Sequence, residues 1–198
     1  AFGSVQPGDV KYRDLDKNGV VDQNDVTQVG KSPFPEWYFS FGGKIAWKGF
    51  DLEVLFQGAA GMSVNILDNK NQVVAFVNNG NAYDIAKGAW AYYPEQGIDT
   101  RATATYPRLT TQSNENNYQT SSMWVKNADY LKLRNLELGY NFNAMKLQKA
   151  GVDNLRVYLS AHNLLTFSGL LKNYNMDPEK ISGYPTIKSY NVGVSITF

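Results

Sequence analysis

The stretch Tyr190-Asn-Val-Gly-Val-Ser-Ile-Thr-Phe198 decides the predicted fold. Its alternate residues are apolar or aromatic: Tyr190, Val192, Val194, Ile196 and Phe198. The residues between them are Asn, Gly, Ser and Thr, so the stretch has the period of two that is typical of a β-strand with one apolar face. The alternation continues to a final aromatic residue, although chain ends usually fray. This favours the closing strand of an outer-membrane β-barrel, with the last strand of a soluble sandwich as the alternative.

Composition excludes several classes of protein. The 198 residues contain 19 Lys and Arg against 18 Asp and Glu, and this balance gives no argument for nucleic-acid binding. The chain has no cysteine, which excludes disulfides, thiolate catalysis and zinc ribbons. No apolar run approaches the ~18 residues of a membrane-spanning helix. The chain begins at Ala1 without an initiator Met, so we expect a piece of a longer protein.

Residues 14–25 have the spacing of an EF-hand calcium loop. Gly19 stands where such a loop turns sharply, and Asp25 replaces the usual final Glu, as in dockerin-type loops. The predicted ligands are Asp14, Asp16, Asn18, the Val20 carbonyl, Asp22 and Asp25. The sequence therefore predicts a structural Ca²⁺ site, with a solvated acidic turn as the alternative. All these ligands come from one loop, and no catalytic base accompanies them.

Two tryptophans indicate the length of the first strand. Trp37 and Trp47 share one face of an alternating stretch and are 47 − 37 = 10 residues apart. At about 3.3 Å per residue they span ~33 Å. A tilt of roughly 40° projects this to ~25 Å, the height of the apolar band between the aromatic girdles of a membrane barrel. A soluble core strand is typically about 5–6 residues long, so this spacing favours the membrane.

Carboxylates on the next strand indicate a wet face. After a tight Lys48-Gly49 turn, residues 50–57 alternate, and Asp51 and Glu53 lie opposite the apolar side chains. Two carboxylates would be costly in a core between two sheets but cost little in a hydrated lumen. A glycosidase acid/base pair is the other use of paired carboxylates. Nothing here separates their pKa values, and no nucleophile–base pair occurs, so we predict that the protein is not an enzyme.

The segment 58–122 is long and rich in Asn, which predicts a functional or disordered loop. Its aromatic residues Trp90, Tyr92, Tyr93 and Tyr106 are suited to stacking on a ligand such as a sugar ring. Packing of the loop onto itself is the alternative use of the same residues.

Alternation returns at residues 124–142 and 154–166. Leu131 and Leu133 are out of phase with Leu136 and Leu138, so we predict a β-bulge near Arg134-Asn135. The lone His162 has no partner at the spacing of a metal site or a triad.

If Phe198 ends in the periplasm, both short connections, 48–49 and 143–153, lie on the periplasmic side. Both long loops and the calcium segment are then extracellular, as barrels of this kind arrange them.

In order, these motifs resemble a known family. They are the calcium loop, the Pro-x-Trp strand, "FDLEVLFQGAAG", "YPRLT", "SSMWVKNADYLKLRNLELGYNF", "NLRVYLSAHNLLTFSG", "DPE" and "YNVGVSITF". The chain resembles the C-terminal end of the SusC/RagA-type TonB-dependent transporters of Bacteroidetes outer membranes. One departure is that the strand ending at Phe142 lacks the proline that often follows in the family.

The resemblance implies an all-β fold of antiparallel strands forming the C-terminal part of a large, 22-stranded transmembrane β-barrel with long extracellular loops. Residues 1–35 would form an extracellular loop with the calcium-binding motif, and residues 36–198 the last five strands and their loops. The implied function is import of oligosaccharides or peptides with a SusD-like surface lipoprotein, driven by the TonB complex through an N-terminal part absent from this sequence. Outer-membrane lipid and the barrel-assembly machinery, which would read the terminal strand, are further implied partners.

A second hypothesis belongs to another class. A soluble carbohydrate-binding or adhesion module with a calcium-stabilised loop would also be rich in β-strands and surface aromatic residues. Detergent dependence separates the two, because a protein that stays monodisperse without detergent would not carry a lipid-facing surface.

Overall fold

The computed structural model describes residues 2–142 and 151–198, which are mostly antiparallel strands with a few short helices. The chain divides into two compact units. Unit 1 comprises Ala1–Pro33 and Ser63–Asn127, and unit 2 comprises Phe34–Met62 and Ala128–Phe198. The N-terminal segment therefore shares its unit with the long central loop. None of the described helices is long and apolar enough to span a membrane.

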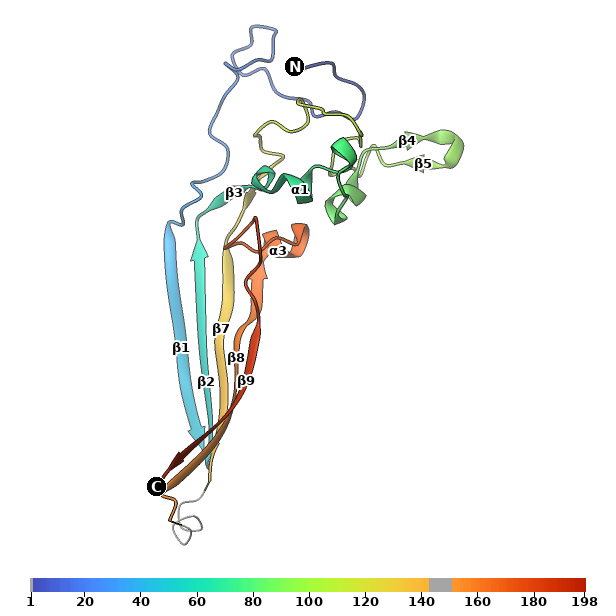
Figure 1. Cartoon of the computed structure of the whole chain (residues 1–198). Helices are drawn as coiled ribbons and strands as arrows, with labels where there is room; N and C mark the ends of the chain where they lie inside the picture. Colours follow the sequence, from blue (N-terminus) through green and yellow to red (C-terminus); the bar gives the residue numbers. More distant parts are fainter. Residues whose placement is uncertain (1, 143–150) are drawn as a thin grey trace. The chain divides into compact units, whose positions relative to one another are not determined.

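Unit 2 is built on one five-stranded antiparallel sheet with the order β1-β2-β7-β8-β9 (Figure 1). The strands are β1 (Trp37–Trp47), β2 (Phe50–Ala60), β7 (Tyr130–Asn141), β8 (Asn154–Ser168) and β9 (Ser189–Thr197). The helix α3 (Gly169–Tyr174) follows β8, and its N-terminus is capped by the Ser168 hydroxyl, which accepts a hydrogen bond from the Leu170 amide at 3.2 Å. The five strands predicted from the sequence are thus present, although the strand predicted over residues 124–142 begins only at Tyr130.

The turn between β1 and β2 contains two residues, as predicted. Lys48 and Gly49 both have positive φ angles, of 48° and 89°. Such angles match the turn to the twist of the flanking strands, and Gly adopts them without strain. The predicted connection at 143–153 falls largely on residues 143–150, which lie outside the described part of the chain.

The sheet has one apolar face, defined by cross-strand rows of apolar side chains. One complete row runs Ile45, Leu52, Leu138, Leu159 and Val192 across all five strands. A neighbouring row runs Trp47, Phe50, Tyr140, Val157 and Val194. Most of these side chains are exposed, although burial of large apolar groups drives folding in water. Five strands therefore share one continuous apolar surface that no described residue covers.

The predicted β-bulge is confirmed. In the pairing of β2 with β7, Leu55 lies opposite Asn135 and Phe56 opposite Leu133, so Arg134 is the additional residue. The pairing of β7 with β8 shifts at the same place. The bulge brings Leu131 and Leu133 onto the apolar face and leaves the charged residues of this stretch on the opposite, polar face.

The predicted strand 124–142 is divided in the structure. β6 (Val125–Asn127) pairs with β3 (Ser63–Asn65) in unit 1, and β7 begins only at Tyr130. Two hydrogen bonds lie at the division. The Ala128 amide donates to the Met62 carbonyl at 3.1 Å, and the Met62 amide donates to the Asp129 carboxylate at 3.1 Å.

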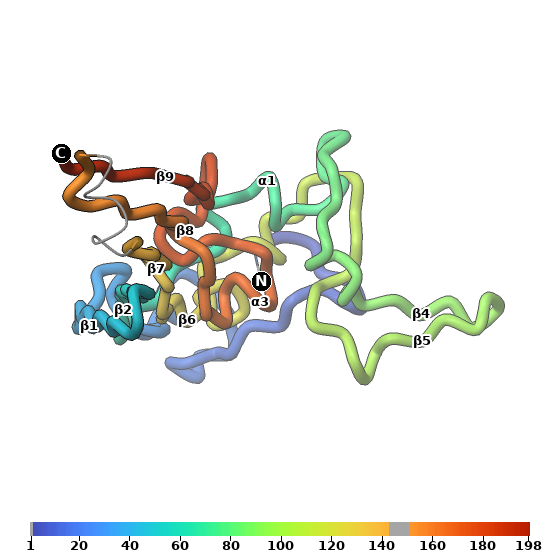
Figure 2. The backbone as a smooth tube through the Cα atoms, turned by 90° about the horizontal axis from the view of Figure 1, so that it is seen from below, coloured from blue at the N-terminus to red at the C-terminus, as the bar shows by residue number. Residues whose placement is uncertain are grey.

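Unit 1 consists of short elements joined by loops. Besides β3 and β6 it contains the helix α1 (Lys70–Val73), the β4 (Tyr92–Tyr93) and β5 (Ile98–Asp99) hairpin, and 3₁₀ helices at Ile66–Asn69, Val77–Asn79, Asp84–Gly88 and Pro94–Gln96. The β4–β5 hairpin projects away from α1 and the rest of this unit (Figure 2). The largest fully buried side chains of the unit are Ile66, Val73, Tyr106, Trp124, Asn116 and Asn117.

Candidate functional site

The polar face of the sheet carries a charge cluster near the β1–β2 turn. Asp51 on β2 is almost fully buried and faces Arg156 on β8 across the intervening β7. The Arg156 guanidinium donates to Asp51 at 2.5 and 3.1 Å and to Glu137 at 2.7 Å. Gly139 on β7 makes this reach possible, because a Cβ there would collide with the guanidinium. Arg156 thus offsets two carboxylates that would otherwise repel each other.

A second cluster surrounds Lys132, whose side chain is 0% exposed. Its ammonium group lies 2.8 Å from Asp177 and 2.6 Å from Glu179. Glu179 also accepts hydrogen bonds from the Tyr130 hydroxyl at 2.7 Å and from Arg134. Charged hydrogen bonds on every side are what allow an ammonium group to remain buried. This group is called the Lys132 cluster below.

The Lys132 cluster fixes the loop between α3 and β9 onto the polar face. Burial alone would raise the pKa of Asp177, but hydrogen bonds from Lys132 and Thr186 outweigh it and hold this pKa below its usual value. The pKa of Glu179 is likewise lowered, because Arg134 and Lys132 outweigh the effect of burial. Both carboxylates therefore stay ionised near neutral pH and keep the loop attached.

The predicted calcium loop brings three of its carboxylates together. Oxygens of Asp14, Asp16 and Asp25 lie within 4.8 Å of one another. Backbone amides of Lys17 and Gly19 donate to Asp14 at 2.6 and 2.8 Å, which curls the loop around this residue. Two other predicted ligands accept hydrogen bonds from the loop backbone. The Asn18 side chain accepts one from the Val20 amide at 2.7 Å, and the Asp22 carboxylate accepts one from the Asn24 amide at 2.7 Å.

Asp25 closes the loop from its far end. Its carboxylate accepts hydrogen bonds from the backbone amides of Asp22, at 2.9 Å, and Leu15, at 2.5 Å. These amide donors lower the pKa of Asp25. Clustered carboxylate oxygens are the donor set that Ca²⁺ prefers, so the residues present fit this ion.

The four predicted ligand-contacting aromatic residues occupy two environments. Tyr92 and Tyr93 are exposed on the β4–β5 hairpin, where the Arg101 guanidinium lies 3.7 Å from the centre of the Tyr92 ring. Tyr106 is only 2% exposed, and its hydroxyl bonds the Val73 carbonyl at 2.7 Å. The half-buried Trp90 pairs its backbone amide with the Tyr106 carbonyl at 2.9 Å. Tyr106 thus serves the packing of the loop, while the hairpin pair faces outward.

Sequence reasoning missed the buried polar network that holds unit 1 together. Asp9 accepts hydrogen bonds from the side chains of Asn114 and Asn117 at 3.0 and 2.8 Å and pairs with Arg108 at 2.7 Å. Asn116 donates to the Val10 carbonyl at 2.9 Å. These contacts join positions about a hundred residues apart, so only the run of Asn residues at 114–117 could have indicated them.

The predicted assembly-signal residues Tyr190, Val192, Val194, Ile196 and Phe198 are 49–82% exposed. The first four lie on the apolar face through the pairing of β9 with β8.

No family model matches the sequence. Among proteins of known name, TonB-dependent receptor P3 of Formosa agariphila is 27% identical over 99% of this chain, which corresponds to 20% of that receptor. TonB-dependent receptor SusC of Bacteroides thetaiotaomicron is 27% identical over 98% of this chain and 18% of its own length. The RagAB peptide transporter superposes with a TM-score of 0.64 over 85% of this chain and 18% of that chain, at 27% identity. The chain is similar to a segment of the SusC/RagA-type TonB-dependent transporters.

The resemblance stated from the motifs is therefore confirmed. A SusC/RagA-like segment is all-β, and these relatives are named as receptors and transporters rather than enzymes. The chain spans about a fifth of the length of the curated relatives that it matches.

Proposed function

We propose that this SusC/RagA-like chain is part of the β-barrel wall of a TonB-dependent outer-membrane transporter that imports oligosaccharides or peptides. The observation that carries the proposal is the continuous apolar face of the five-stranded sheet, whose rows of exposed Ile, Leu, Val and aromatic side chains suit a lipid environment. The similarity to TonB-dependent receptors and to the RagAB peptide transporter supports the same function.

In this proposal the polar face lines the lumen of a 22-stranded barrel. The ion clusters around Asp51 and Lys132 give the wall a hydrophilic surface of both charge signs. Within the described residues, β1 and β9 are each paired on one side only. Unpaired edges are unfavourable in lipid, so further strands of the intact transporter would complete the pairing. The apolar face would contact outer-membrane lipid, and the barrel-assembly machinery would insert the barrel.

Unit 1 and the loop 175–188 would lie on the extracellular side, where a SusD-like lipoprotein caps the transporter and contacts the ligand. The TonB complex would act from the periplasm through a part of the protein outside this chain. The alternative, a soluble carbohydrate-binding or adhesion module, has to explain why the apolar face is exposed, since soluble monomers seldom expose apolar patches above a few hundred Å².

We further propose that Asp14, Asp16, Asn18, the Val20 carbonyl, Asp22 and Asp25 hold a structural Ca²⁺ ion. The grouping of three carboxylates in the loop supports this. The ion would rigidify residues 14–25 by neutralising charges that repel one another, and it would take no part in transport chemistry.

The transport function is tested in cells that carry the intact gene. We expect deletion of the gene to abolish uptake of at least one class of fluorescently labelled oligosaccharide or peptide, and depletion of TonB to have the same effect, because transport depends on energy from the inner membrane. Complementation with the wild-type gene is the control. Uptake that survives the deletion for every labelled compound taken up by the parent strain would refute the proposal.

A further inference from the structure

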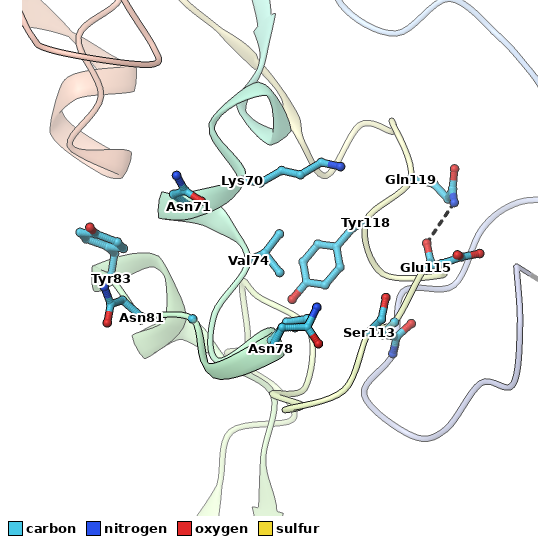
Figure 3. A pocket seen from close by; sticks show the side chains of 13 residues that line it. Lys70, Asn71, Val74, Asn78, Asn81, Tyr83, Ser113, Glu115, Tyr118 and Gln119 are labelled. Carbon is cyan, nitrogen blue, oxygen red and sulfur yellow. Dashed lines mark hydrogen bonds between the residues drawn. The ribbon is translucent and has the colours of Figure 1, made fainter.

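Unit 1 contains a cavity of about 790 Å³. Its lining includes none of the calcium-loop residues and none of the four aromatic residues described above. It lies between residues 70–83, which include α1 and the 3₁₀ helix Val77–Asn79, and residues 113–119 (Figure 3). Its volume falls within the roughly 300–1,000 Å³ of known small-molecule sites. Because both walls belong to unit 1, the cavity is formed within one compact part of the chain.

Amide side chains dominate the lining of the cavity. They belong to Asn71, Asn78, Asn81, Asn114 and Gln119. Asn71, Asn78 and Asn81 are exposed, and within the described part of the chain their side-chain amides make no hydrogen bond to protein. Each such amide offers two donor hydrogens and an acceptor oxygen with two lone pairs. Three of them around one cavity provide unused donors and acceptors for a ligand rich in hydroxyl groups.

The wall that faces these amides is held rigidly. Tyr118 points toward Val74 and Asn78 (Figure 3), and its hydroxyl lies 2.8 Å from that of Tyr106. Burial, reinforced by the Tyr106 hydroxyl, raises the pKa of Tyr118, which therefore keeps its proton. Behind this wall, Asn114 donates to Asp9 at 3.0 Å. A pre-formed wall lowers the entropy lost on binding.

The charge and apolar content of the cavity select the class of ligand. Lys70 and Glu115 are the charged residues of the lining, one of each sign, so an anionic or cationic ligand gains little. The aliphatic part is limited to Val74 and Val77. A peptide ligand would require apolar recesses for its side chains. The exposed Tyr83 ring offers a flat surface for a sugar ring to lie on.

We propose that this cavity binds a neutral oligosaccharide. The inference rests on the proposed transport function for its biological meaning and narrows the ligand class of that function from oligosaccharides or peptides to neutral glycans. Binding at the cavity itself can be measured independently of transport.

The test uses the intact protein purified in detergent. The probes are neutral hexasaccharides of α-1,4-glucose, β-1,3-glucose, β-1,4-xylose and β-1,4-mannose, with mixed-sequence hexapeptides for comparison. We expect at least one hexasaccharide, and no hexapeptide, to slow hydrogen exchange in residues 70–83 and 113–119. The double variant Asn71→Ala/Asn81→Ala should weaken binding of that sugar by about 4-fold or more, since each neutral hydrogen bond contributes a factor of roughly 2 to 12.

Two further variants separate loss of binding from loss of folding. Val74→Phe should fill the cavity and weaken binding while the protein stays monodisperse in detergent. Asn173→Ala, which removes an exposed amide on α3 in unit 2, should bind the sugar as the wild type does.

Three results would overturn the inference: no hexasaccharide protects the two segments, a hexapeptide protects them instead, or the double variant binds with unchanged affinity. Uptake assays distinguish this failure from failure of the transport function. If the double variant loses no affinity while cells still require the gene for uptake, the cavity inference is wrong and the transport function stands.

Discussion

At the scale of single residues, the Lys132 cluster makes a clear stability prediction. Lys132→Met would leave Asp177 and Glu179 facing each other without the ammonium group that lies 2.8 and 2.6 Å from them. Removing one partner of a buried ion pair costs about 3–5 kcal/mol. A free-energy change of 1.4 kcal/mol corresponds to about tenfold in an equilibrium constant, so we expect the loop 175–188 to open at least about 100-fold more often. Faster hydrogen exchange of this loop in the intact protein would measure the opening.

The same loop supplies the control. Lys180→Met makes the identical chemical change at an exposed side chain and should leave exchange of the loop unchanged. Adding Asp177→Asn to Lys132→Met should recover part of the loss, because Asp177 has then lost its cation, whereas Glu179 still pairs with Arg134. Equal exchange in Lys132→Met and Lys180→Met would show that the cluster does not hold the loop.

The pH dependence of this attachment follows from its carboxylates. Asp177 and Glu179 have folded-state pKa values below the ordinary 3.8 and 4.5. A lowered carboxyl pKa contributes stability that is fully present above the unfolded-state pKa and is lost as the pH falls through the folded-state pKa. The loop should therefore remain attached from neutral pH down to about pH 5 and detach only in stronger acid.

Residues differ in how far sequence alone predicts their roles. The grouping of Asp14, Asp16 and Asp25 is predictable because it depends on spacing within twelve residues. The contacts of Lys132 with Asp177 and of Asp9 with Asn117 span 45 and 108 positions. A period-two pattern assigns such residues to a face but does not identify their partners, which depend on strand order and on loops that return to the sheet.

At the scale of elements, the five long strands are predictable because alternation is strong wherever one face is apolar and the other polar. The bulge at Arg134 is predictable for the same reason, since a change of phase requires an extra residue. The separation of β6 from β7 is not predictable from alternation. It depends on the hydrogen bond from the Ala128 amide to the Met62 carbonyl, and neither residue belongs to a strand. Both β6 and β7 are extended, so the alternation of side chains hardly changes between them.

The calcium loop provides a prediction at this scale. Asp14→Asn keeps the shape of the side chain but removes one charge from the carboxylate group. We expect Ca²⁺ to slow hydrogen exchange of residues 12–27 in the wild-type intact protein, and the variant to require at least about tenfold more Ca²⁺ for the same protection, since ligand charge tunes the affinity of such loops.

Local exchange is the appropriate readout, because calcium bound elsewhere in the intact protein would not protect these residues. Glu95→Ala removes an exposed carboxylate from the 3₁₀ helix Pro94–Gln96 and serves as the control. Exchange of residues 12–27 that is identical in Ca²⁺ and in chelator would mean that the loop holds no ion, and that its hydrogen bonds alone define its shape.

At the scale of the whole molecule, the two faces of the sheet make opposite demands on their surroundings. In the proposed transporter, the apolar face contacts lipid, and the polar face offers charges such as Asp51 and Arg156 to water in the lumen. A closed barrel meets both demands and also pairs every strand edge. Under this proposal the five strands form part of the barrel wall, and their stability depends on neighbouring strands of the intact protein.

Two adjacent residues of β2 test this arrangement directly. Val54 lies on the apolar face opposite Gly43 and Leu136, in a row near the middle of the strand between Trp37 and Trp47, while Leu55 points to the polar face. Val54→Lys would place a charge near the middle of the bilayer, at a cost of about 2–4 kcal/mol. We expect it to reduce the amount of folded protein in the outer-membrane fraction severalfold, whereas Leu55→Lys should be tolerated. Equal recovery of the two variants would argue against a lipid-facing position for Val54 and therefore against the membrane barrel.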